Sequence, residues 1–473
     1  MRQSQNSEGP NEEECFEDVS MSKVMHQMSM KIERVKAGMG EAQRDLISDE
    51  TCGPTQGPES TGSGLLLEVL ARENLLRAMK RVKANKGVAG IDGMDIDQSV
   101  EYLKLHWEEI RFKLLAGTYR PSPVRRVMIP KTGGGERELG IPTVVDRLIQ
   151  QALLQVLQPL IDPTFSEHSH GFRPERRAHD AVLAAQSFVQ KGKRVVVDVD
   201  LEKFFDRVNH DILIDRLSKR VNDAGVIRLV RAYLDSGIMV DGVVIDRTQG
   251  TPQGGPLSPL LANIMLDEVD KELERRGYSF ARYADDCNVY VSSRKSGERV
   301  MSLLRRLYAK LRLKINESKS AVASVFGRKF LGYSLWVAKG GAVKRRVADK
   351  AIKAYKQRVR QLSRRSVGKS MAEVVEKLKL YVNGWKAYFK LADTPGVWRE
   401  LDEWMRHRLR AIQLMQWRRG STMYRELLKL GAPEGIARKV AANSRCWWRN
   451  SDGHIQMVLT IKYFDGIGAP RLT

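Results

Sequence analysis

A β-branched run that ends in carboxylates constrains this chain most. Residues 194–200 read Arg-Val-Val-Val-Asp-Val-Asp, which predicts a strand whose last side chain is Asp200. Residues 280–291 read Phe-Ala-Arg-Tyr-Ala-Asp-Asp-Cys-Asn-Val-Tyr-Val, which predicts two short strands and a tight turn. Asp285 and Asp286 lie on that turn, and the Asp200 side chain is expected to reach the same point.

Three clustered carboxylates indicate a particular chemistry. Adjacent like charges are costly unless something neutralises them. With no His or Cys nearby, the donor set favours Mg²⁺ over zinc. Two Mg²⁺ ions can activate an attacking hydroxyl and stabilise a leaving pyrophosphate. Taken alone, an Asp-Asp pair is more often a solvated turn, so the surrounding sequence must decide.

The periodicity of apolar residues predicts two regions of different architecture. Helices are expected at 65–83, 100–117 and 259–276, with Ser258 as the N-cap of the last. A hairpin is expected at 124–141. After about residue 345 the strands stop, and apolar stripes predict three basic amphipathic helices, at 352–362, 374–388 and 401–412. The fold class is therefore α+β, followed by a helical bundle.

The charge distribution points to a polyanionic partner. The chain has 473 residues and a formal net charge of +23. Residues 1–60 hold 6 basic and 12 acidic side chains, and we expect a flexible acidic extension. Residues 341–473 hold 29 basic and 11 acidic side chains and six of the eight Trp. Basic and aromatic residues together suit backbone contact and base stacking, although most of these Trp are expected in the core.

Composition excludes several other classes of protein. The hydrophobic fraction of 42% excludes a wholly disordered chain. No apolar run approaches the roughly 18 to 20 residues of a membrane helix, and the N-terminus lacks a signal peptide, so no membrane partner is expected. Four distant cysteines make a disulfide framework or a cysteine-built zinc site improbable.

Several segments resemble one known family in the same order. Tyr-Ala-Asp-Asp at 283–286 resembles the catalytic turn of reverse transcriptases, and residues 200–206 resemble the strand with their first metal-binding aspartate. Residues 250–259, Gly-Thr-Pro-Gln-Gly-Gly-Pro-Leu-Ser-Pro, resemble the loop around template and incoming nucleotide. The later palm segments and the fingers hairpin are matched by 316–320, 330–333, 124–131 and 137–143.

Other segments narrow the resemblance to group II intron-encoded enzymes. The loop at 90–93 and the segment 165–179 are typical of that group, and residues 378–389 look like its thumb or maturase domain. Many members end in a Cys/His-rich nuclease domain, for which only Cys446 and His454 are present near the C-terminus. The chain thus resembles bacterial group II intron reverse transcriptase/maturases of the class C type, which lack the endonuclease.

The resemblance implies the catalytic and metal-binding residues. Asp200, Asp285 and Asp286 would bind two Mg²⁺ ions, for which Mn²⁺ can substitute, with the Leu201 carbonyl as a further ligand. Asp198 shares a strand face with Asp200 and is a rival ligand. The family register favours Asp200.

The resemblance also implies nucleotide-binding residues. Lys131 and Arg137 would bind the triphosphate, although both could simply be exposed at a hairpin tip. Phe205 would lie under the sugar and exclude a ribose 2′-hydroxyl, while Phe204 packs in the core. Gln253 would contact the nucleotide or its template base, or would be a plain turn residue.

The nucleic-acid contacts are less specific expectations. Arg125, Arg126, Arg173 and Arg176 could hold the template backbone, but arginine runs are more often solvated. Tyr283 could support the primer terminus or only pack at the hairpin.

The implied protein is an RNA-directed DNA polymerase with a right-hand fold that also assists intron splicing. Fingers and palm are expected at 61–337, a helical thumb or maturase domain at 338–425, and a basic region that is a candidate for DNA binding at 426–473. The implied partners are intron RNA, an RNA template with a DNA or RNA primer, target DNA and dNTPs, in the bacterial cytoplasm and at the nucleoid.

Two alternatives remain open from the sequence. One is a maturase that mainly binds RNA, against which the intact aspartate set argues. The other is a reverse transcriptase recruited for host defence or DNA repair, which the catalytic residues cannot separate from the first reading.

Overall fold

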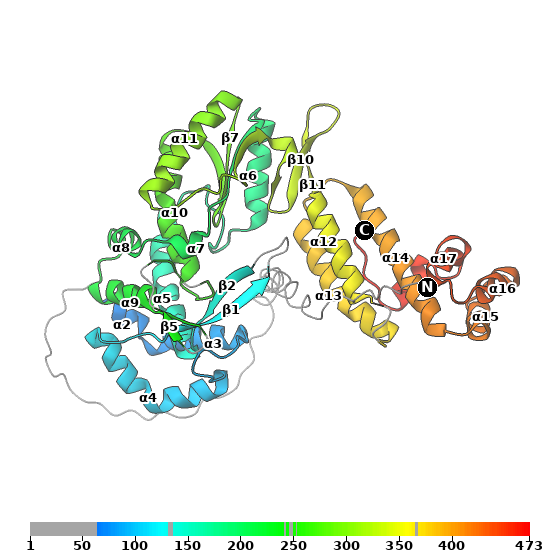
Figure 1. Cartoon of the computed structure of the whole chain (residues 1–473), viewed down its shortest axis with the longest axis horizontal. Helices are drawn as coiled ribbons and strands as arrows, with labels where there is room; N and C mark the ends of the chain where they lie inside the picture. The colour runs from blue at the N-terminus through cyan, green and yellow to red at the C-terminus, as the bar shows by residue number, and fades with distance from the viewer. Residues whose placement is uncertain (1–63, 131–135, 241–242, 246–248, 252, 365–367) are drawn as a thin grey trace, which may run out of the picture. The chain divides into compact units, whose positions relative to one another are not determined.

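The computed structural model describes residues 64–130, 136–240, 243–245, 249–251, 253–364 and 368–473. These residues belong to two compact units, one up to Leu331 and the other from Gly332 to Thr473 (Figure 1). Among the described helices, none is both long and apolar enough to cross a membrane.

The palm of the first unit is a four-stranded antiparallel sheet. Its strand order is β6 (Ser279–Tyr283), β7 (Asp286–Val291), β3 (Val195–Val199) and β8 (Ala321–Ser324). The predicted strands at 194–200 and 280–291 are therefore confirmed. Because β3 and β7 are buried on the core side by Val, Cys and Tyr side chains, their register is strongly specified.

Three helices cover this sheet: α6 (Ala178–Gln190), α10 (Ser258–Arg275) and α11 (Arg294–Lys310) (Figure 1). The expectation that Ser258 caps α10 is wrong, since the N-cap is Leu257 and Ser258 is the first helical residue. The Ser258 hydroxyl instead accepts a hydrogen bond from Thr251 at 3.3 Å, in the preceding loop.

A second sheet lies in the fingers. Its order is β2 (Glu136–Ile141), β1 (Val124–Pro130), β4 (Ile238–Val240) and β5 (Val243–Ile245). The antiparallel β1–β2 pair confirms the predicted hairpin, while β1 and β4 are parallel.

The helices of the fingers surround α5 (Val144–Ile161), which is buried over most of its length. The helix expected at 65–83 is interrupted at Leu70 and Ala71. The Asn74 side chain donates to the carbonyls of Val69 and Ala152, so it closes the first helix and anchors the second to α5. The remaining elements of this unit are α2 (Leu65–Val69), α3 (Arg72–Ala84), α4 (Ile96–Ala116), η2 (Asp162–Thr164), α7 (Phe204–Arg207), α8 (His210–Ser218), α9 (Ala224–Asp235), η3 (Val325–Gly327) and β9 (Lys329–Phe330).

The second unit is helical after one hairpin, as expected. Its core is aromatic: the Trp385 ring lies 4.5 Å from Tyr355 and 4.6 Å from Phe389, between centroids. The elements are β10 (Tyr333–Val337), β11 (Val343–Val347), α12 (Asp349–Leu362), α13 (Met371–Phe389), α14 (Pro395–Trp417), α15 (Gly420–Lys429), α16 (Glu434–Ala442), α17 (Trp447–Asn450), η5 (Gly453–Met457) and α18 (Ile461–Gly466).

Candidate active site

The palm sheet brings the predicted aspartates to one end. Val199 pairs with Cys287, so the next residues outward on the two antiparallel strands are Asp200 and Asp286. Tyr283 pairs with Asp286 across the β6–β7 turn, which places Asp285 within that turn. The convergence follows from strand direction, because β3 ends where β7 begins.

The carboxylates at this end act on one another electrostatically. Burial, followed by the charges of Asp198, Asp285 and Asp200, raises the pKa of Asp286 to about 7. Burial also raises the pKa of Asp285, with a smaller contribution from Asp200. An excess of negative charge in a half-buried site is a configuration that a cation relieves.

Two cations of the protein lie near the β3 carboxylates. Lys319 Nζ is 3.4 Å from Asp200 Oδ2, and Arg328 is 3.5 Å from Asp198 Oδ2. Burial raises the pKa of Asp198. Asp198 therefore belongs to the same electrostatic cluster and stays a rival to Asp200 as a metal ligand.

The backbone at Asp200 and Leu201 is held by the segment after α11. The Asn316 amide donates to the Asp200 carbonyl at 2.8 Å, and the Asp200 amide donates to the Ser320 hydroxyl at 3.0 Å. The Glu202 amide donates to the Lys314 carbonyl at 2.8 Å, and Leu201 forms an antiparallel β-bridge with Ile315. The two hydrogen bonds of this bridge are made by the neighbouring residues, so neither uses the Leu201 carbonyl.

The donor set fits a hard divalent cation, because it consists of carboxylate and carbonyl oxygens. Within the described ranges, no group of three or more His, Cys, Asp and Glu side chains is placed to hold a metal ion by itself. Mg²⁺ is usually held by one or two carboxylates, waters and substrate phosphates rather than by an all-protein cage. An incomplete protein site that substrate phosphates complete is consistent with that preference.

A buried arginine supports the catalytic turn from below. Arg282 is 1% exposed and precedes the Tyr-Ala-Asp-Asp turn. It forms a bidentate ion pair with Asp270 of α10 and donates to the Ala284 carbonyl at 2.8 Å. Its remaining donors reach Asn263 at 2.9 Å and Ser169 at 2.7 Å, so all five N–H groups are satisfied.

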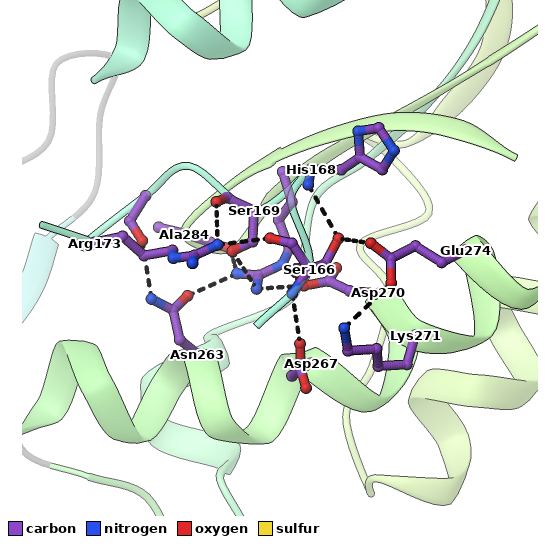
Figure 2. Close-up of polar contacts among 12 residues, drawn as sticks. Ser166, His168, Ser169, Arg173, Asn263, Asp267, Asp270, Lys271, Glu274 and Ala284 are labelled. Atoms are coloured by element: carbon purple, nitrogen blue, oxygen red, sulfur yellow. Dashed lines mark hydrogen bonds and ion pairs between the residues drawn. The ribbon is translucent and has the colours of Figure 1, made fainter. Parts of the chain in front are cut away.

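A polar stripe on α10 carries this support further. Figure 2 shows Asn263, Asp267, Asp270 and Glu274 projecting from α10 toward the segment that contains Ser166. Their spacing of 4, 3 and 4 residues places them on one helix face. The sequence reading assigned no role to these residues or to Arg282. The available signal was four polar residues at helical spacing, three of which are buried with the apolar side chains of the helix.

The backbone of the β6–β7 turn also packs closely against the segment that contains Ser166 and Gly171. Ala284 adopts φ +57°, a left-handed conformation that is uncommon for a residue other than glycine. A Cβ on Gly171 would lie 2.2 Å from the Ala284 amide nitrogen. The approach therefore requires glycine at 171.

Arg173 has a structural role instead of the expected template contact. It is 8% exposed and forms an ion pair with Asp162 at 3.0 Å. Its guanidinium also donates to the carbonyls of Asp162, Ser166 and Ser169, so every donor is used internally. Arg176 is bonded to Glu167 through both terminal nitrogens and keeps part of its surface exposed.

The glycine-rich loop is bonded to α7 on one side and to β2 on the other. The Thr251 amide donates to the Phe205 carbonyl at 2.8 Å, and the Gly140 amide of β2 donates to the Gln253 carbonyl at 2.8 Å. The Gln253 side chain is half-buried. Phe204 is 3% exposed and packs in the core as predicted, whereas Phe205 is half-buried against its edge.

The other predicted contact residues lie on strands of the fingers and palm. Arg137 is exposed on β2, and Arg126 on β1 pairs with Glu138 at 3.0 Å. Arg125 Nε is buried and has no hydrogen-bond partner among the described atoms. Tyr283 is half-buried at the end of β6, and Lys131 falls outside the described residues.

A palm sheet with aspartates at the β3 end and on the β6–β7 turn, followed by a helical unit, defines a template-directed nucleic-acid polymerase. Residues 129–335 match the family model "Reverse transcriptase (RNA-dependent DNA polymerase)", and residues 352–431 match "Group II intron, maturase-specific domain". The chain belongs to the family of group II intron-encoded reverse transcriptase/maturases, which confirms the predicted class and fold.

The relatives agree with this assignment. The chain is 32% identical to protein YkfC of Escherichia coli K12, over 57% of this chain and 82% of YkfC. It is 37% identical to the group II intron-encoded protein LtrA of Lactococcus lactis subsp. cremoris, over 41% of this chain and 32% of LtrA. Among solved structures, a chain of a Cas6-RT-Cas1–Cas2 complex is 23% identical, over 58% of this chain and 47% of that chain, with a TM-score of 0.35.

Proposed function

We propose that this protein synthesises DNA on an RNA template by two-metal nucleotidyl transfer and that it binds a group II intron RNA to assist its splicing. The observation that supports the polymerase most is the convergence of Asp200, Asp285 and Asp286 at one end of the palm sheet, where burial, followed by the charges of Asp198, Asp285 and Asp200, raises the pKa of Asp286 to about 7. When bound, two Mg²⁺ ions would lower the pKa of the primer hydroxyl and stabilise the leaving pyrophosphate.

The protein residues would position the reactants. Asp200, Asp285, Asp286 and the Leu201 carbonyl would hold the metal ions, with Mn²⁺ able to replace Mg²⁺. Arg137, exposed on β2, would bind the triphosphate together with Lys131. Preorganised cations of this kind respond to charge that develops in the transition state.

The residues near the sugar and the template would set specificity. The half-buried Phe205 ring would exclude a ribose 2′-hydroxyl by bulk, and Gln253 would contact the nucleotide or template base. Arg125, Arg126 and Arg176 would contact the template backbone, and Tyr283 the primer terminus. Arg173 is withdrawn from this set, because its donors are consumed internally.

The maturase activity rests on the match at residues 352–431. The intron RNA would hold the splicing active site, and the protein would stabilise its fold through the basic surface. The same complex would then insert the intron into target DNA, where the protein copies it from a DNA primer.

The polymerase is tested by dNTP incorporation on an RNA template with an annealed DNA primer, with and without Mg²⁺. Asp285→Asn removes one ligand charge at nearly constant volume and is expected to lower kcat by at least about 100-fold. Glu298→Gln removes the same charge from an exposed site on α11 and serves as the control. Equal incorporation by Asp285→Asn and the wild-type protein contradicts the proposal.

The maturase activity is tested by splicing of the intron that flanks the reading frame, at an Mg²⁺ concentration too low for self-splicing. The wild-type protein and Asp285→Asn are both expected to accelerate splicing, because the RNA supplies that active site. An absence of any acceleration contradicts the maturase role. It would then favour the alternative of a reverse transcriptase used in host defence or DNA repair.

A further inference from the structure

A cavity of about 360 Å³ opens between α14 and the C-terminal segment of the second unit. From α14 it is lined by Glu403, Arg406 and Arg410, whose spacing of three and four residues places them on one face. From the C-terminal segment it is lined by residues that include Thr460 and Lys462. The lining thus carries three cations and one carboxylate.

Arg410 is buried in this lining and forms no ion pair at contact distance with a described residue. It is 4% exposed, and its Nε donates to the Ser451 carbonyl at 2.7 Å. Across the described ranges, no carboxylate forms an ion pair with it, and its other four N–H groups have no protein acceptor. The terminal nitrogens of Arg410 therefore have donors left for a ligand in the cavity.

Two carboxylates, Asp452 and Glu403, act on Arg410 electrostatically without forming an ion pair with it. The Asp452 carboxylate accepts from the Gly453 amide at 2.9 Å and from Gln456 at 2.8 Å. Glu403 is exposed and lines the same cavity. Burial, and next the charge of Arg406, lowers the pKa of Arg410, while the charges of Asp452 and Glu403 act in the opposite direction.

A purely structural role explains only part of this arrangement. Ser451 is the C-cap of α17, and a cation at a helix C-terminus is favourable. That role uses one of the five guanidinium donors. It does not account for Arg406 and Lys462 on the walls of the same cavity.

We propose that this cavity binds a phosphodiester group of the nucleic acid that the protein holds. A phosphate offers several acceptor oxygens to a guanidinium fork, and Arg406 and Lys462 would add charge from the two walls. The Thr460 hydroxyl, which accepts from the Tyr463 amide at 3.2 Å, keeps its own hydrogen for a phosphate oxygen. The cavity is remote in sequence from the aspartates and joins the maturase-specific region to residues beyond its matched end at 431.

The test measures binding by the full-length protein to a fluorescein-labelled 20-base-pair DNA duplex and to an RNA hairpin. Fluorescence anisotropy is recorded over a KCl series without dNTPs, so a failure of the polymerase proposal leaves the result readable. Arg406→Gln/Lys462→Gln is expected to bind about tenfold more weakly at 0.1 M KCl, with the log–log salt slope shallower by about 1.

Arg425→Gln/Lys429→Gln is the matched control, because it removes the same charge from α15, where both cations bond to Glu426. Loss confined to the duplex assigns the phosphate to DNA, loss confined to the hairpin assigns it to RNA, and loss on both assigns it to either. Unchanged binding by the cavity variant, or equal weakening by the control, overturns the proposal. Should the double variant unfold early in a thermal melt, Lys462→Glu, on an exposed helix residue, decides the question in the same way.

Discussion

At the residue scale, burial and the neighbouring carboxylates both raise the pKa of Asp286. Its ordinary pKa is 3.8, and in the folded protein it is about 7. Between these values the folded state binds more protons than the unfolded state, so the free energy of unfolding falls as pH rises. Above about pH 7 the Asp286 carboxylate is ionised, and the fold bears the full free-energy cost of burying that charge beside other carboxylates. A bound divalent cation offsets this cost.

This predicts a specific pH dependence of stability. In metal-free buffer, the Tm of the wild-type protein is expected to fall relative to that of Asp286→Asn between pH 4 and pH 8. Addition of Mg²⁺ at pH 8 is expected to raise the wild-type Tm more than that of the variant. Differential scanning fluorimetry measures both, and parallel pH profiles would show that Asp286 does not titrate in this way.

A second residue-scale prediction concerns the Arg282–Asp270 ion pair. Arg282→Met leaves Asp270 buried and unpaired, so we expect a loss of about 3–5 kcal/mol in unfolding free energy. Arg282→Met/Asp270→Leu removes both charges and is expected to recover much of that stability. It would not recover kcat, because the donor to the Ala284 carbonyl is still missing.

Comparing the single and double variants separates the role of Arg282 in positioning the catalytic turn from its role in stabilising the fold. Denaturant unfolding gives the stability of each variant, and primer extension at saturating substrate gives kcat. Full recovery of kcat in the double variant would mean that Arg282 matters only for the fold. Arg275→Met is the control, because Arg275 lies on α10 like Asp270 but forms its hydrogen bonds with Glu272 at the exposed surface.

At the element scale, the catalytic turn is supported by a helix and a loop far from it in sequence. Helix α10 supplies Asn263 and Asp270, and the loop before α6 supplies Ser169 and Gly171. The turn is therefore a stiff part of the palm, as a site that must hold charged groups in fixed geometry requires.

Gly171→Ala tests how tight this contact is. Its Cβ would lie 2.2 Å from the Ala284 amide nitrogen, so backbone must move, at a cost of about 1–3 kcal/mol. We expect kcat to fall more than substrate affinity, because the displaced turn carries Asp285. Gly327→Ala has open space around the added atom and is the control, and similar kcat values for the two variants would contradict the prediction.

At the scale of the whole molecule, the net charge of +23 is concentrated where the maturase-specific match lies. In that region Trp404 lies within cation–π distance of Lys356, Arg360 and Arg408, at 5.5 to 5.7 Å. Basic and aromatic side chains thus meet at the surface of the helical unit, while Trp385 lies in its core.

Binding of structured RNA is therefore expected to be strongly salt-dependent. If six or more phosphates are contacted, affinity should fall by about 10³-fold between 50 and 200 mM KCl. Filter binding at several KCl concentrations measures the slope. A slope near zero would show that the positive charge does not contact the RNA backbone.

Short-range patterns in the sequence were sufficient for the elements and the aspartates. Alternation and β-branched residues predicted β3, β6 and β7, and helical spacing predicted α12, α13 and α14, because these depend on neighbours a few residues away. Strand direction then brought Asp200 and Asp286 to the same end of the sheet.

Only the tertiary structure decided the partners of the polar side chains. Arg173 was expected to contact the template and Arg282 was assigned no role, yet each is buried with all its donors used. Ser258 carried a capping signal but bonds to Thr251, and Arg410 faces a cavity made by a segment some 50 residues away. A hydrogen bond or ion pair depends on which surfaces pack together. Local periodicity determines the faces of an element, but long-range packing determines what each face meets.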